Sequence, residues 1–252
     1  MTTPRQSRRT WLLACAVLLV VGFVALGSWQ VQRRAWKLDL IERVTQRVAA
    51  PVVDAPGPAR WPTLNAANDE YRHVRLTGRF MPGRDTRVQA VTRLGSGFWL
   101  LSPLQLADGA VVLVNRGFIP PQSTPAAPPD GGVTITGLLR LTEPRGGFLR
   151  QNDPINDRWF SRDAGAIAQA RGLAATGQVA PYFVDVDAPP AGLEAPPDQP
   201  VGGLTVIAFA NSHLVYALTW FALALMSAGA GIVLARQNRP HDDPNRSDPG
   251  QD

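Results

Sequence analysis

The sequence predicts a membrane protein in which two transmembrane α-helices flank a β-rich extracytoplasmic domain. Two runs, 10–32 and 201–235, contain no Asp, Glu, Lys or Arg. Each is longer than the roughly 20 apolar residues that a helix needs to cross a bilayer. Between the runs, short stretches rich in β-branched and aromatic residues alternate with Gly and Pro turn signals, which is typical of an antiparallel sheet or barrel.

The first span, expected at 10–32, has a tryptophan near each end. Trp11 and Trp29 are 18 positions apart. That separation is about 27 Å along a helix, close to the thickness of a hydrocarbon core, so both side chains are expected at membrane interfaces. A cleaved signal peptide is the alternative, since arginines precede the run. Because the run exceeds the roughly 7–15 apolar residues of a signal peptide, we expect an uncleaved anchor.

Small residues in both spans favour close helix packing. In the second span, Ser227 and Gly231 form a small-xxx-small pair. We therefore expect the two helices to pack against each other. In the first span, the predicted packing face consists of Ala14, Leu18, Gly22, Ala25 and Trp29.

Basic residues occur on both sides of the first span, so their distribution alone does not decide the orientation. A connecting segment of this length translocates largely regardless of its charge, and a basic N-terminal tip usually stays inside. We therefore expect both termini in the cytoplasm. The predicted segments are a cytoplasmic N-terminus 1–9, a first span 10–32, an external β-rich domain 33–210, a second span 211–235 and a disordered cytoplasmic tail 236–252.

Composition and missing motifs exclude several kinds of site. The net charge is +5, but the basic residues gather mainly beside the spans, which favours anionic lipid headgroups over nucleic acid as partners. The single cysteine, Cys15, excludes an intrachain disulfide. No two of the three histidines have the spacing of a metal-ligand pair, and no HExxH, P-loop or nucleophile-elbow motif is present. We expect His73 in a surface or cross-strand role and His241 in solvent.

The middle of the chain predicts one helix continuing the first span and a set of strands. The 3.6-residue apolar period of 32–48 extends the first helix until Pro51. A short helix is expected at 163–172, capped by Asp163. Proline-rich 120–130 and 188–200 are expected as a loop and a stiff stalk. Strands are expected at 71–80, 86–92, 98–104, 110–118, 133–141 and 182–186, with a further extended run at 204–209.

Two polar clusters follow predicted strands. Asn115, Arg116 and Gly117 end a strand that has a buried pattern. Such a strand end can point side chains at a site. The alternative, which we favour, is that the polar side chains satisfy backbone groups while Gly117 adopts a conformation that other residues avoid. The cluster at 152–154 predicts a turn, and the aromatic pair at 159–160 is expected to pack over the sheet.

The head of the second span carries the clearest functional pattern. His213, Tyr216 and Trp220 lie at i, i+3 and i+7, so a helix places imidazole, phenol and indole on one face, above Ala224 and Ser227. A flat, apolar ligand that contains a metal ion would suit this face. The alternative is a polar residue at the membrane boundary beside an interfacial aromatic belt.

Together, several segments in chain order resemble the SURF1 (Shy1-type) family of cytochrome oxidase biogenesis proteins. One departure is Phe118, where the family often has Trp. The resemblance covers nearly the whole chain. The segments that carry it are Leu26-Gly27-Ser28-Trp29-Gln30 with Arg33, Trp36 and Lys37; Tyr71-Arg72; Gly78-Arg79-Phe80; 97–103; 114–120; Asn152, Pro154 and Trp159; and Asn211, His213-Leu214, Tyr216, Thr219 and Trp220.

The resemblance implies a protein of the cell inner membrane whose middle domain is periplasmic. It implies assistance in inserting heme a into oxidase subunit I, with other oxidase assembly or heme a synthesis factors as partners. His213 would be an axial ligand of the heme iron, and Tyr216 and Trp220 would contact the ring. Arg33, Arg34 or Lys37 would pair with the heme propionates if the helices pack.

Two other functions stay open. A membrane-anchored scaffold would bind oxidase subunits or assembly factors through the β domain without touching heme, and His213 would then be replaceable. An exported enzyme is the third hypothesis. The lack of a recognisable nucleophile or metal constellation argues against it, so we expect no enzymatic activity.

Overall fold

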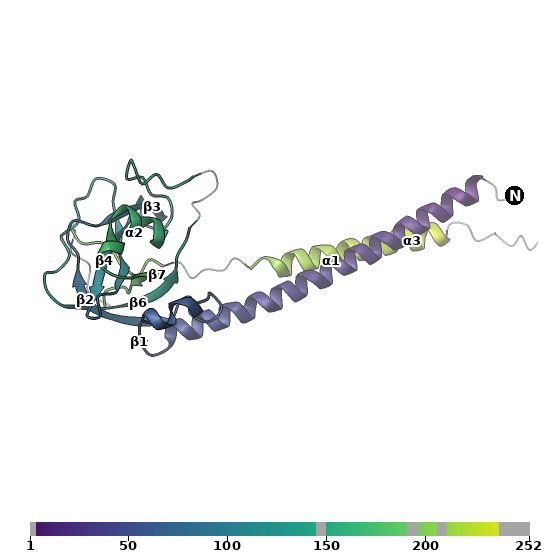
Figure 1. Ribbon diagram of the computed structural model, residues 1–252. Helices are drawn as coiled ribbons and strands as arrows, with labels where there is room; N and C mark the ends of the chain where they lie inside the picture. The colour runs from purple at the N-terminus through teal and green to yellow at the C-terminus, as the bar shows by residue number, and fades with distance from the viewer. Residues whose placement is uncertain (1–3, 145–149, 191–195, 197, 206–210, 237–252) are drawn as a thin grey trace, which may run out of the picture. The chain divides into compact units, whose positions relative to one another are not determined.

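The computed structural model describes residues 4–144, 150–190, 196, 198–205 and 211–236 (Figure 1). The chain forms two compact units. The helical unit consists of 1–41 and 209–252, and the β domain consists of 42–208. The predicted tail, and most of the extended run expected at 204–209, lie outside the described residues.

Two long helices, α1 (Pro4–Ala49) and α3 (His213–Arg236), are each long and apolar enough to cross a membrane. α1 continues without a break past residue 32 and ends two residues before Pro51, as its apolar period predicted. Most of the apolar side chains between 11 and 31 are exposed, which distinguishes α1 from the buried core helix of a soluble protein.

Within the helical unit, α1 and α3 pack in antiparallel orientation, which confirms the predicted pairing (Figure 1). The ring of Phe221 lies where a Cβ on Gly27 would be, and a Cβ on Gly231 would lie 3.4 Å from Ala16. The less exposed positions recur at intervals of three and four, the spacing of a coiled-coil seam. Among them are Leu13, Ala16, Val20, Phe23, Gly27 and Gln30 on α1 and His213, Ala217, Trp220, Ala224, Ser227 and Gly231 on α3.

The predicted packing face of α1 is wrong. Ala14, Leu18, Gly22, Ala25 and Trp29 are exposed, and nothing lies within 4 Å of a Cβ built on Gly22. The reason is that apolar residues surround the whole first span, so its pattern does not mark one face. Only the partner helix selects the seam, because a glycine there admits the ring of Phe221.

The described residues of the β domain form seven strands and three short helical segments, and all six predicted strands are present. The two-residue β1 was not predicted, since it is too short to show alternation. The strands are β1 (Val53–Asp54), β2 (His73–Phe80), β3 (Thr86–Thr92), β4 (Gly95–Leu106), β5 (Val111–Ile119), β6 (Val133–Leu141) and β7 (Val179–Val186). The helical segments are η1 (Pro58–Thr63), α2 (Ala164–Ala170) and η2 (Leu173–Ala175).

The strands form a closed barrel with the order β1-β2-β6-β7-β5-β4-β3, in which β2 also pairs with β4. The predicted barrel is therefore confirmed. Its pairing is mixed rather than purely antiparallel, because β1–β2 and β5–β7 are parallel. The chain between β6 and β7 includes α2 and η2, and β7 returns between β6 and β5. Being antiparallel to β6, it must run parallel to β5.

The core has two layers. Alternate residues of β2, β5, β6 and β7 fill the barrel interior, among them Leu76, Val114, Leu139 and Tyr182. On the outer face, α2 and Trp159 cover a second cluster. Trp159 is only 2% exposed, so this member of the aromatic pair packs as predicted.

The short helix α2 is capped as the sequence predicted. The Asp163 side chain accepts a hydrogen bond from the Ala166 backbone at 3.0 Å. Gly172, with φ 64°, follows its end in the left-handed region. Both caps satisfy backbone groups that the helix ends leave unpaired.

Candidate functional site

His213 is the first residue of α3 and bonds directly to α1. Its Nδ1 lies 2.8 Å from Oε1 of Gln30. With the amide oxygen as acceptor, a neutral ring carries its proton on Nδ1 and keeps the lone pair of Nε2. A histidine held in one tautomer by its second nitrogen is the usual arrangement of a metal-bound imidazole. The side chain of His213 is half-buried.

Aromatic rings flank the next turns of the same seam. Trp220 stacks on Phe23 with a centroid distance of 5.7 Å and an interplanar angle of 23°. Tyr216 is 53% exposed, because it lies beside the seam rather than in it. The structure thus brings His213 and Trp220 against α1 and leaves Tyr216 open. Sequence reasoning missed the roles of Gln30 and Phe23, because apolar residues on every side of the first span hide their heptad spacing with Gly27.

Asn211, two residues before α3, has an unsatisfied acceptor. Its Oδ1 is buried and has no hydrogen-bond partner among the described residues. Buried polar atoms of this kind are uncommon in folded proteins and often mark a site that accepts a ligand or water. Among the described residues, the head of α3 therefore presents an imidazole bonded through Nδ1, apolar rings and one oxygen acceptor without a partner.

The three basic residues expected to meet propionates lie further along α1. Arg33 stacks over the Trp36 ring, 4.3 Å from its centroid, and Arg34 and Lys37 are half-buried. The site residues fit an iron porphyrin in their chemistry, since a neutral imidazole is a common axial ligand. Among the described residues, no group of three His, Cys, Asp or Glu side chains is arranged to hold a metal ion by itself.

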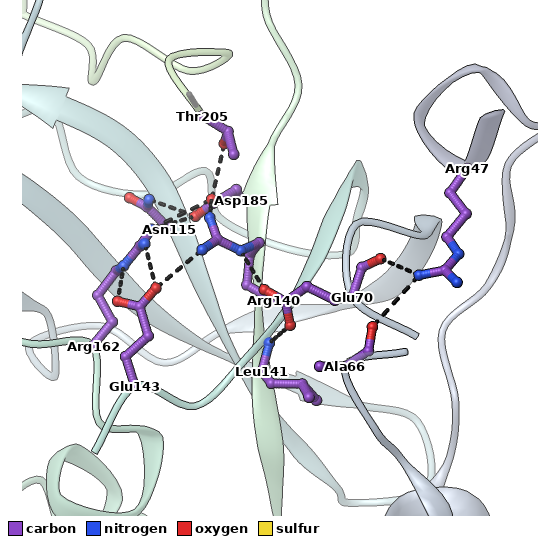
Figure 2. A network of polar contacts seen from close by, with 10 residues as sticks. All are labelled: Arg47, Ala66, Glu70, Asn115, Arg140, Leu141, Glu143, Arg162, Asp185 and Thr205. Atoms are coloured by element: carbon purple, nitrogen blue, oxygen red, sulfur yellow. Dashed lines mark hydrogen bonds and ion pairs between the residues drawn. The ribbon is translucent and has the colours of Figure 1, made fainter. Parts of the chain in front are cut away.

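A second polar cluster, the Asp185 hub, lies in the β domain (Figure 2). Asp185 is 4% exposed. Asn115 Nδ2 donates to its Oδ1 at 2.7 Å. Arg140 and Arg162 each donate at 3.1 Å, and Thr205 Oγ1 donates at 2.8 Å. We use the name for Asp185, Asn115, Arg140, Arg162, Thr205 and the two outer carboxylates, Glu70 and Glu143.

The outer carboxylates of the Asp185 hub give its two arginines further ion-pair partners. Glu70 accepts from Arg140 at 2.8 Å, and Glu143 accepts from both arginines at 3.0 and 2.7 Å. Burial opposes the charge on Arg140, but Asp185 and Glu70 outweigh it and raise the pKa of that guanidinium. The Asp185 hub is therefore a network of mutually bonded ion pairs rather than an acid–base pair.

The Asp185 hub joins segments that are far apart in the sequence. Arg47, in the last turn of α1, donates to the backbone oxygen of Glu70 at 3.3 Å, and Thr205 lies eight residues before α3 (Figure 2). Asn115 also accepts from the Gly117 backbone at 3.2 Å. This confirms that Asn115 satisfies backbone and buried groups, as we favoured. For the other members of the Asp185 hub, the sequence signal was a charged residue inside a predicted strand, such as Asp185 in 182–186.

His73 bonds to a residue beyond β7, a strand that does not neighbour β2, so the contact is not the cross-strand pair that we expected. Its Nε2 lies 2.7 Å from Oδ2 of Asp187, just past the end of β7. The turn at 152–154 is also present. Asn152 accepts from the backbones of Phe160 and Ser161 at 2.8 and 3.0 Å.

Comparison with known proteins identifies the family. The model of the SURF1 family matches residues 17–225. This chain belongs to the SURF1 family. The matched residues include Gln30, His213 and Trp220 of the helical unit and every member of the Asp185 hub, so the match spans both units.

Relatives from distant vertebrates agree with the SURF1 assignment. Surfeit locus protein 1 of Xenopus tropicalis is 33% identical over 235 residues, which cover 84% of this chain and 71% of the relative. The Homo sapiens protein of that name is 32% identical over 236 residues, covering 85% and 73%. The Takifugu rubripes protein is 30% identical and is covered over 91% of its length. The resemblance drawn from motifs is thereby confirmed.

Proposed function

We propose that this protein holds heme a at the head of α3 and assists its insertion into subunit I of cytochrome c oxidase. As a member of the SURF1 family, the protein has a role in cytochrome c oxidase assembly, and the proposal adds its cargo. The single observation that carries the proposal is the bond between His213 Nδ1 and Gln30, because it leaves Nε2 available to iron.

A carrier must hold its cargo and also release it. One imidazole supplies a single axial bond, which is weaker than two. Trp220 and the exposed Tyr216 would add contact area to the macrocycle. Arg33, Arg34 or Lys37 would pair with propionates at the outer end of the seam. The heme would leave without rearranging a packed core, since the His213 side chain is only half-buried.

Asn211 favours heme a over heme b. Heme a carries a hydroxyl on its isoprenoid substituent, and heme b lacks one. The unused Oδ1 of Asn211 would accept a hydrogen bond from that hydroxyl.

The proposed setting is the cell inner membrane, with cytoplasmic termini and a periplasmic β domain. Proposed partners are oxidase subunit I, other assembly or heme a synthesis factors, and membrane lipids. We propose no catalytic role, because carrying requires only binding and release. A scaffold that binds oxidase subunits without heme is the competing function.

The proposal is tested by co-expressing the full-length protein with the enzymes that make heme a and recording its absorption in detergent. Wild type is expected to show a heme a band, and His213→Ala to lose it. Gln30→Leu is expected to weaken heme binding by about 10–100-fold, the usual cost of losing the second partner of a metal-bound histidine. His73→Ala is the matched control and should keep the band. Heme-free wild type would instead favour the scaffold.

The role of Asn211 is tested separately by titrating purified protein with heme a and with heme b. Asn211→Ala is expected to lower heme a affinity by about 2–10-fold, the net value of one hydrogen bond, and to leave heme b affinity unchanged. Equal losses for the two hemes would contradict recognition of the hydroxyl.

A further inference from the structure

One end of the barrel opens into a pocket of about 510 Å³, which we call the barrel mouth. Its walls come from the ends of four strands: Phe80 of β2, Arg116 of β5, Ile135 of β6 and Val186 of β7. Prolines of the two proline-rich segments also line it, including Pro129 and Pro200. Mouths of barrels with apolar walls and few polar groups are common ligand sites, and this volume lies within the roughly 300–1,000 Å³ typical of them.

The apolar walls of the barrel mouth continue the barrel interior. Phe80, Ile135 and Val186 pack against the interior cluster that contains Leu76 and Val184. They are only partly buried, so the core reaches the pocket without being closed over. The sequence showed these residues as ordinary strand positions, and only barrel closure turns them toward one space.

Arg116 is the one cation among the described residues that line the barrel mouth, and a β-bulge sets its position. Asn115 pairs with Leu101 and Phe118 with Trp99, so Arg116 and Gly117 together oppose Leu100. Bulges of this kind often re-aim a side chain beside a binding site. Gly117, with φ 132°, supplies the backbone conformation that the bulge needs.

The guanidinium of Arg116 is incompletely paired. One nitrogen, Nη2, donates to the backbone oxygen of Ala126 at 3.1 Å, and the guanidinium carbon lies 5.8 Å from the centre of the Phe80 ring. The other nitrogen, Nη1, is buried and has no hydrogen-bond partner among the described residues. Burial lowers the pKa of this side chain, with Asp85 opposing the shift. An arginine nevertheless stays charged, so this arrangement is costly unless an anion arrives.

The second charged group of the barrel mouth does not satisfy Arg116. Asp187 lines the pocket, but its carboxylate is bonded to His73 at 2.7 Å. Asp85 also has a buried oxygen that no described residue bonds to. A water molecule shared by Asp85 and Arg116 is therefore the rival explanation, and the test below must separate it from a ligand.

We propose that the barrel mouth binds a carboxylate attached to an apolar body. The carboxylate would take the free Nη1 of Arg116, and the body would cover Phe80, Ile135 and Val186. A phosphate would suit the walls poorly, because a doubly charged, strongly hydrated group loses more on entering an apolar pocket. Two sources share this chemistry, a fatty acid and the propionate of a porphyrin.

The site is tested on the full-length protein in lipid nanodiscs with a photoreactive diazirine derivative of dodecanoic acid and with the matching alcohol. Labelled residues are mapped by mass spectrometry. The acid is expected to label peptides containing Phe80, Ile135 or Val186, and the alcohol to label them at least about tenfold less, the value of a charge-assisted hydrogen bond. Equal labelling by acid and alcohol, or labelling confined to α1 and α3, would overturn the proposal.

Three variants make the test specific. Arg116→Gln is expected to lower labelling of the barrel mouth by about tenfold or more. Ile135→Trp should block labelling by filling the pocket while it keeps Arg116, so the test survives if Arg116→Gln does not fold. Arg87→Gln is the matched control, because Arg87 also donates to a backbone oxygen of the 120–130 loop but lies outside the pocket lining. Unchanged labelling in Arg116→Gln would support the water bridge to Asp85 and overturn the site.

Competition by unlabelled ligands identifies the source of the carboxylate. Unlabelled dodecanoic acid and metal-free mesoporphyrin are added separately to the labelling reaction. Displacement by dodecanoic acid alone identifies a fatty acid site, and stronger displacement by mesoporphyrin identifies a propionate site. Failure of both to compete would overturn the proposal. A metal-free porphyrin cannot bind iron to His213, so this result is independent of heme binding at α3.

Discussion

Asp185→Asn is expected to lower the free energy of unfolding of the β domain by about 3–5 kcal/mol, the usual cost of breaking a buried ion pair from one side. Every side chain that bonds to the Asp185 carboxylate is a donor: Asn115, Arg140, Arg162 and Thr205. The amide nitrogen of the new asparagine would face one of these donors. Two buried guanidinium groups would also lose the more deeply buried of their two shared counter-charges, while Glu143 remains. Thermal unfolding followed by circular dichroism should show a fall of roughly 6–20 °C.

The control for Asp185→Asn is Asp54→Asn, which removes a carboxylate from an exposed pair with Arg75. That change is expected to cost about 1 kcal/mol or less. A double-mutant cycle with Arg140→Gln should give a coupling energy of about 0.5–3 kcal/mol between the two positions. Equal small losses for Asp185→Asn and Asp54→Asn would contradict the view that the Asp185 hub holds the barrel together.

Gly117→Ala is expected to have the second largest effect, a loss of about 2–6 kcal/mol made up of backbone strain and steric overlap. At φ 132°, an L side chain is strained whatever the space around it. A Cβ at this position would also lie 2.4 Å from the backbone carbon and oxygen of Val201. The backbone of Val201 must therefore move away from β5.

Hydrogen exchange locates the damage in Gly117→Ala. Phe118 and Val201 exchange two backbone hydrogen bonds of 2.9 Å, and Leu204 packs on Phe118. The amides of 118 and 201 are expected to exchange faster in the variant than those of β6. Gly95→Ala is the matched control, since Gly95 has φ 101° but nothing within 4 Å of its missing Cβ. Gly95→Ala therefore measures backbone strain without steric overlap. A loss of stability as large as that of Gly117→Ala would contradict the clash with Val201.

Local patterns predicted the elements well, for a physical reason. Hydrophobic period, capping residues and turn residues act within a few positions, so α1, α3, α2 and the six longer strands could be predicted from neighbouring residues alone. Asp163 is an example, because a cap needs only the next three residues. The conformation of Gly117 was predictable too, since glycine alone adopts it without strain.

The errors concern residues whose partners are distant in the sequence. The seam of α1 depends on Phe221, which is 194 positions from Gly27, so no pattern within the first span could reveal it. The direction of β5–β7 depends on where the chain returns after α2. Gln30 had no predicted role, because its value as an acceptor exists only when His213 lies beside it.

By itself, the sequence determined the two apolar spans, the β-rich middle and the SURF1 motifs, because period, composition and motif order are all properties of the chain. The tertiary structure alone decided which nitrogen of His213 faces Gln30, which donors surround Asp185, and that Arg116 shares a pocket with Phe80, Ile135 and Val186. Each of these depends on distances between segments that only packing brings together. Hydrogen bonds and burial act over a few ångströms in space, whatever the separation along the chain.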